Sequence, residues 1–148
     1  MTTATNTQTA SRSDMSALRR GAIIAYRWLI LGFLLAGGIQ IFLAGLGVFS
    51  FRDQDAAAGS SAFDAHQTLG FTVGGIAVVI LIAALIARPG VLPTCLAGVL
   101  VLQTCLVQSL LASLADNTAL YGGLHALDGL LALSIAGFLH ASARRGPA

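Results

Sequence analysis

Charged side chains are scarce in this sequence, and their scarcity excludes a soluble globular domain. Only 9% of the 148 residues are charged, whereas roughly a quarter are charged in a typical soluble domain. Lysine and glutamate are absent, so all eight basic residues are arginine and all six acidic residues are aspartate. A net charge of +2 carried by so few groups gives no sign of nucleic-acid binding.

Cysteine is also rare, because Cys95 and Cys105 are the only two in the chain. They lie in one apolar run, roughly three helical turns apart, so they cannot bond to each other. The sequence is therefore not a disulfide scaffold, and it has no cysteine motif for covalent attachment of haem.

Hydrophobic residues are abundant, making up 56% of the chain, and they gather in four long runs. We expect helical spans at about residues 22–49, 62–87, 91–112 and 118–142. Each contains the ~20 apolar residues that cross the ~30 Å hydrocarbon core of a bilayer, where unpaired backbone groups are too costly. The pattern predicts an all-α integral membrane protein, folded as an up-down four-helix bundle.

Turn and capping residues mark the ends of these runs. The Arg-Pro-Gly sequence at 88–90 predicts a very short turn between the second and third spans. Ser61 and Asp64 have the spacing of a capping box, which would start the second helix near residue 62. Asp116 is placed to cap the fourth helix.

The arginines are distributed unevenly between the two ends of the spans. Only Arg52 lies on the side of the first and third loops. The remaining arginines lie on the opposite side, namely Arg12, Arg19, Arg20, Arg27, Arg88, Arg144 and Arg145. The positive-inside rule then places both termini in the cytoplasm, as a multi-pass protein of the bacterial inner membrane. Residues 1–17, rich in Thr, Ser and Asn, are predicted to form a disordered cytoplasmic tail, with the membrane domain over 18–148.

Two of the three histidines, His66 and His125, lie near the outer ends of the second and fourth spans. At ~1.5 Å per residue they sit about 33 Å and 28 Å above the inner arginines, whereas His140 is one turn from the cytoplasmic end. The second and fourth helices of an up-down bundle are diagonal, and the gap between them suits two imidazoles on opposite faces of an iron porphyrin. The alternative is interfacial packing or pocket polarity.

Each of these histidines is followed one turn later by a glycine, Gly70 and Gly129, which would leave room for a flat ring against the backbone. A weak internal repeat accompanies the motif, because Gln40 and Gln103 each begin a similar tetrapeptide in the span before a histidine.

Asp128 is the only acidic residue well inside a span, so it should face the bundle and find a partner there. The heights favour a hydrogen bond between Gln108 and Asp128, and a lower polar layer of Gln40 and Gln103 with Thr72. These side chains serve either as interhelical hydrogen bonds or, for Asp128, in proton exchange coupled to a redox centre.

Three segments carry a resemblance to a known family: Gln40-Ile-Phe-Leu-Ala-Gly-Leu-Gly47, Ala65-His66-Gln-Thr-Leu-Gly70 and Leu124-His125-Ala-Leu-Asp128. Over its four spans the chain resembles small bacterial membrane proteins of domain-of-unknown-function family 6220, whose name implies no activity. It is more distantly similar to one four-helix half of haem A synthase and to cytochrome b561-like bundles, which implies that His66 and His125 are the haem ligands.

The departures from these families limit what the resemblance implies. Haem A synthase pairs two such halves and has an acidic catalytic residue and, often, loop cysteines, so its activity does not follow for a single half. Transfer across the membrane by cytochrome b561 needs two haems, and here only His140 remains near the inner face.

The sequence therefore predicts a membrane protein with one b-type haem near the extracytoplasmic face, serving electron transfer or haem binding and sensing. Its partners would be the lipid bilayer and a membrane redox protein or a second copy of the chain. The alternatives are a cofactor-free assembly or interaction subunit, or a small-molecule or quinone pocket with Asp128 as its proton site. No catalytic residue is identified, and whether the chain is an enzyme is left open.

The orientation can be tested at the loop that follows the first span. A cysteine placed at Ser60 should react with a membrane-impermeant thiol reagent in whole cells, because seven of the eight arginines lie on the opposite side. The unsubstituted chain, whose cysteines both lie within the third span, is the control. Labelling at residue 60 only after cell lysis would reverse the orientation.

Overall fold

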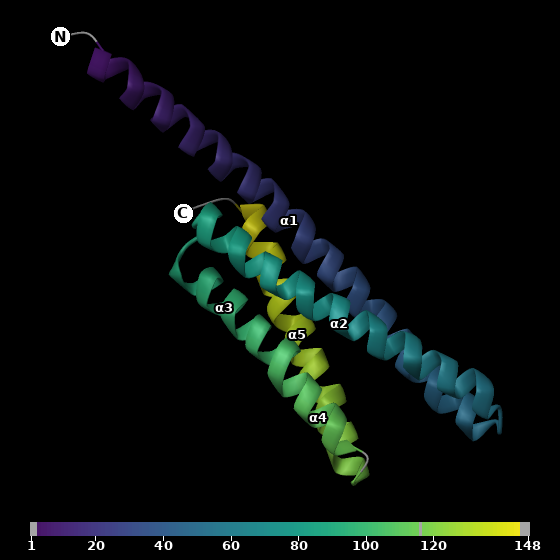
Figure 1. The fold of residues 1–148 in the computed structure, drawn as a ribbon. Helices are drawn as coiled ribbons and strands as arrows, with labels where there is room; N and C mark the ends of the chain where they lie inside the picture. The colour runs from purple at the N-terminus through teal and green to yellow at the C-terminus, as the bar shows by residue number, and fades with distance from the viewer. Residues whose placement is uncertain (1–2, 116, 146–148) are drawn as a thin grey trace.

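The computed structural model describes residues 3–115 and 117–145, and every regular element in these ranges is a helix (Figure 1). In chain order these are α1 (Thr3–Arg52), α2 (Ala56–Ala87), α3 (Val91–Leu102), the π-helix η1 (Gln103–Val107), α4 (Gln108–Ala115) and α5 (Ala119–Arg145). Because α3, η1 and α4 follow one another without a gap, these elements make four long helices. All four are long and apolar enough to cross a membrane, which confirms the all-α prediction and the four apolar spans.

The four long helices pack as neighbours in a ring. Contacts join α1 to α2, α2 to α3, α4 to α5, and α5 back to α1. Within the described ranges no Cα pair lies within 8 Å between α2 and α5, or between α1 and α3. The α1–α2 hairpin and the hairpin of α3, α4 and α5 lie together near the C-terminal end of α5, and they separate toward Arg52 and Ala115 (Figure 1).

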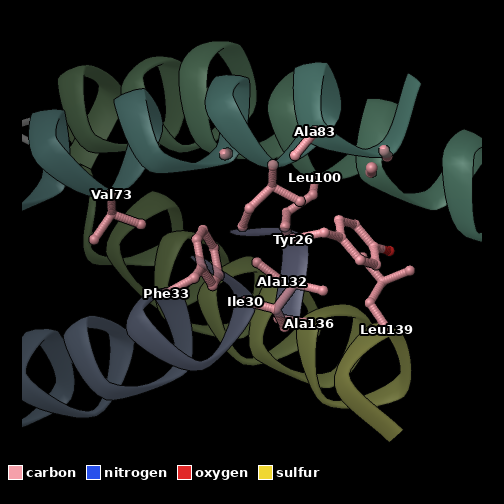
Figure 2. Close-up of a cluster of buried hydrophobic side chains, with 13 residues drawn as sticks. Tyr26, Ile30, Phe33, Val73, Ala83, Leu100, Ala132, Ala136 and Leu139 are labelled. Carbon is pink, nitrogen blue, oxygen red and sulfur yellow. The ribbon is translucent and has the colours of Figure 1, made fainter. Parts of the chain in front are cut away.

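Large and small side chains alternate in the core, where the two hairpins meet (Figure 2). Ile30 and Phe33 of α1 are fully or almost fully buried. They belong to one cluster with fully buried alanines of the other helices, namely Ala77, Ala84, Ala97 and Ala136. Small residues let helix backbones approach closely, which is how helices associate in lipid, where the hydrophobic effect gives little drive.

The outer surface of the helices carries many large apolar side chains that are not part of the core. Trp28 and Phe71 are 68% and 72% exposed, in company with many leucines and isoleucines. Such a surface is unfavourable in water and suits a hydrocarbon surrounding. Tyr26, close to Trp28 in the sequence, is by contrast 2% exposed and part of the core.

Two helix starts differ from the sequence prediction. α1 begins at Thr3, well before the expected start of the first span near residue 22. No glycine or proline precedes Gly21, so nothing in the sequence interrupts the backbone hydrogen bonds. The helix of 50 residues is roughly 75 Å long, well beyond the ~30 Å core of a bilayer.

α2 begins at Ala56, ahead of the predicted capping box at Ser61 and Asp64. Its N-cap is Asp55, whose side chain accepts a hydrogen bond from the backbone N–H of Ala58 at 3.0 Å. Alanines in the first turn then carry the helix through the predicted start. The predicted cap Asp116 lies outside the described residues, and Thr118 Oγ1 accepts from the N–H of Leu120 at the start of α5.

The closeness of this packing can be tested at Ala136, which is fully buried. Ala136→Leu should lower the free energy of unfolding by about 1–3 kcal/mol, because the core has no room for the added atoms. Ala141→Leu, at an exposed position of the same helix, is the matched control and should have little effect. The measurement is the unfolding midpoint in detergent, and equal midpoints for the two variants would contradict the packing described.

Candidate functional site

The rings of His66 and His125 meet between the diagonal helices α2 and α5. Their centroids lie 6.0 Å apart, and the ring planes are inclined at 63°. Since no Cα of α2 lies within 8 Å of a Cα of α5, the two side chains reach toward each other across the bundle. The structure thus brings together the pair that the sequence placed at similar heights.

His140 lies elsewhere. It is ~22 Å from His125 along α5, and its Nδ1 is buried without a hydrogen-bond partner in the described part of the chain.

The two histidines make equivalent hydrogen bonds, each to a backbone oxygen of the neighbouring helix. His66 Nδ1 lies 3.1 Å from the backbone oxygen of Gln40, and His125 Nδ1 lies 3.1 Å from the backbone oxygen of Gln108. A carbonyl oxygen only accepts, so Nδ1 must carry the hydrogen in both rings, and in the neutral imidazole Nε2 then holds the free lone pair. Metal-binding histidines are held in the same way by a second hydrogen bond from the ring.

Gly70 and Gly129 also occupy equivalent positions. A Cβ at Gly70 would lie 3.1 Å from Nε2 of Gln40, and one at Gly129 would lie 3.4 Å from Nε2 of Gln108. The glycines were expected to make room for a flat ring, and in the structure each of them leaves room for a glutamine amide. Each half of the site therefore has one glutamine. Its backbone oxygen accepts a hydrogen bond from the histidine, and its side-chain amide lies against the glycine.

This equivalence corrects the internal repeat inferred from sequence, which paired Gln40 with Gln103. Gln108 is the residue that matches Gln40 in both contacts. A signal for it exists in the sequence, because Gln40-Ile-Phe-Leu-Ala-Gly-Leu46 aligns with Gln108-Ser-Leu-Leu-Ala-Ser-Leu114. Five of the seven positions are identical or both small, so this seven-residue alignment indicates the repeat better than the four-residue alignment with Gln103.

Asp128, one turn from His125 on α5, accepts hydrogen bonds on both carboxylate oxygens. Gln103 Nε2 donates to Oδ1 at 2.9 Å, and Gln108 Nε2 donates to Oδ2 at 3.0 Å. Gln108 Nε2 also lies 3.0 Å from the backbone oxygen of His125. The expected Gln108–Asp128 hydrogen bond is therefore present, and this pattern of donors requires no proton on the carboxyl group.

The lower polar layer expected from sequence does not form. Gln103 donates to Asp128 instead of facing Gln40, and Thr72 Oγ1 donates to the backbone of Thr68 on its own helix.

Gln103 points toward Asp128 because of the π-helix η1. In an α-helix, residues five apart point about 140° away from each other. In η1 the N–H of Gln108 bonds to the carbonyl of Gln103, which places the two amides on the same face toward α5.

The donor set decides which kind of ligand the histidines could hold. Among the residues that the structure describes, no group of three or more His, Cys, Asp or Glu side chains could hold a metal ion. Two imidazoles alone leave a bare ion such as zinc under-coordinated. Two imidazoles do complete the coordination of an iron that already has four porphyrin nitrogens.

The Asp128 cluster can be tested by two substitutions of one residue. Asp128→Leu removes the acceptor of Gln103 Nε2, and Gln103 is only 6% exposed, so we expect a loss of about 1–3 kcal/mol in unfolding free energy. Asp128→Asn should cost less, because Gln103 can turn its amide and accept from the new N–H through Oε1, which is unpaired in the structure. Detergent unfolding midpoints measure both, and equal losses would contradict this account.

No protein-family model matches the chain, and no curated protein or solved structure is detectably similar to it. Any function must therefore be inferred from the His66–His125 pair and the glutamines and aspartate that surround it.

Proposed function

We propose that this protein binds one b-type haem between His66 and His125, as a four-helix bundle that spans the bacterial inner membrane with both termini in the cytoplasm. The observation that carries the proposal is the matched pair of Nδ1 hydrogen bonds to backbone oxygens, each 3.1 Å long. Both rings are fixed in the tautomer that leaves the Nε2 lone pair available to a ligand.

The distance between the rings fits two axial ligands of one metal. Imidazole nitrogens bind transition metals at about 2.0–2.1 Å, so two rings on one ion have centroids about 6 Å apart. The observed separation is 6.0 Å.

The surroundings also favour a flat ligand. The porphyrin would need the region between α2 and α5, which have no Cα pair within 8 Å in the described ranges. Both histidines are partly exposed.

The ligand set favours electron transfer over substrate chemistry. When bound, a haem held by both histidines would supply a one-electron couple and would leave no histidine-free position on its iron for a substrate. The chain's own residues would bind the iron through Nε2 of His66 and His125 and fix the rings through the carbonyls of Gln40 and Gln108. Asp128 would add a negative charge one turn away. The electron would pass to a membrane redox partner or a second copy, unless the protein serves haem binding and sensing.

The orientation of the bundle rests on the arginines. Arg19, Arg27 and Arg88 lie close together at the end of the bundle opposite to Arg52, and this end carries most of the chain's positive charge. By the positive-inside rule it faces the cytoplasm, which puts the histidine pair in the extracytoplasmic half.

The ligands can be tested with a reduced-minus-oxidised optical spectrum of the purified protein, expressed with ample haem. We expect a low-spin b-type spectrum from the unsubstituted protein. His66→Ala and His125→Ala should each give five-coordinate haem or none, because a single axial ligand holds the porphyrin less tightly.

His140→Ala is the matched control and should leave the spectrum unchanged, since His140 lies far along α5 and its Nδ1 has no partner among the described residues. Circular dichroism of each variant separates loss of haem from loss of fold. Absence of haem absorbance from the unsubstituted protein would refute the proposal and leave the cofactor-free subunit as the better account.

A further inference from the structure

A second polar site lies at the opposite end of the bundle from the histidines. A cavity of about 60 Å³ opens where the first half of α1, the turn after α2 and the end of α5 come together. Its polar lining consists of Arg19, Tyr26, Arg27, Arg88 and Ser142. One water needs about 10–15 Å³, so the cavity has room for a group of several atoms.

Three arginines are among the residues that line this cavity, and no carboxylate whose side chain the structure describes forms an ion pair with them. In the described part of the chain the one ion pair joins Arg52 to Asp53, at the other end of α1. Arg19 Nε donates to the backbone oxygen of Ala87 at 3.0 Å, which holds its guanidinium against the end of α2 and leaves its other N–H groups free to bind a ligand. The lining is therefore suited to an anion.

Tyr26 gives an independent indication of a missing partner. Its ring is part of the buried core and is 2% exposed, and its hydroxyl oxygen lies at the edge of that cluster (Figure 2). The hydroxyl has no hydrogen-bond partner among the described residues, although buried polar groups nearly always have one. An anionic oxygen in the cavity would accept its hydrogen.

The turn after α2 also favours an anion. Arg88 adopts a left-handed conformation, with φ 53° and ψ 60°, at a position where glycine is the usual residue. The N-terminus of α3 follows at once, and its N-cap Gly90 offers no side chain to the first N–H groups. Such groups and the positive end of the helix dipole attract negative charge.

We propose that this cavity binds the phosphate group of an anionic phospholipid headgroup. The phosphate supplies several acceptor oxygens, which suits three arginines and one tyrosine hydroxyl. The site lies at the end of four apolar helices, at the level where headgroups border the hydrocarbon, and basic pockets between helices on the cytoplasmic side commonly hold such lipids. The proposal depends on the membrane setting and not on haem.

The test is native mass spectrometry of the purified full-length protein with phosphatidylglycerol or phosphatidylcholine of identical acyl chains. Phosphatidylglycerol should be retained preferentially, and Arg27→Gln or Arg88→Gly should each reduce its retention by about fivefold. Arg88→Gly suits the left-handed backbone, so its fold should be preserved. Tyr26→Phe should also weaken retention, because it removes the unpaired hydroxyl alone.

Arg52→Gln is the control, since it removes the same charge at the opposite end and should leave retention unchanged. Equal retention of the two lipids, or retention unaffected by Arg27→Gln and Arg88→Gly, would refute the proposal. Inorganic phosphate is added as a competitor. If it fails to displace phosphatidylglycerol, the result supports a lipid headgroup as the ligand. Displacement with the same sensitivity to the variants would instead identify free phosphate as the ligand.

Discussion

The hydrocarbon of a bilayer offers no hydrogen-bond partner, and this constraint accounts for most of what is seen in the structure. A backbone surrounded by apolar side chains satisfies its N–H and C=O groups as helix, and the described residues are accordingly almost all helical. The same constraint applies to the polar side chains within the spans. Gln103, Gln108 and Asp128 bond to one another, and the threonines of α2 bond to carbonyls of their own helix.

The histidine site is built from two units with equivalent contacts. A glutamine on one helix accepts from a histidine on the next through its backbone oxygen, and its amide rests on the glycine one turn beyond that histidine. Two copies of this unit face each other across the bundle, and their rings meet at 6.0 Å. Asp128 has no counterpart after His66, where Leu69 stands at the same spacing, so one half alone has an acidic group.

The two ends of the bundle have different chemistry. The histidines are surrounded by glutamine side chains and the carboxylate of Asp128, whereas the other end carries most of the arginines and the unpaired hydroxyl of Tyr26. Between them lies the core of alternating large and small side chains, which fixes the hairpins to each other (Figure 2). A ligand on the histidines and an anion on the arginines would therefore contact separate regions of one rigid unit.

The sequence by itself determined the helical class, the four apolar helices and the similar heights of His66 and His125, because length, hydropathy and rise per residue are local properties. It also placed Gln108 near Asp128. Helix starts were predicted less well, since a capping pattern at Ser61 competes with an uninterrupted helix from Ala56. Only the tertiary structure decided which glutamine serves which histidine and where Gln103 points. The positions of Gln103 and Gln108 depend on the π-helix η1. It changes the direction of the side chains after it relative to those before it, and a regular α-helical period does not predict this change. These arrangements depend also on contacts between residues far apart in the chain, such as His66 with Gln40 and Arg19 with Ala87, which no local pattern specifies.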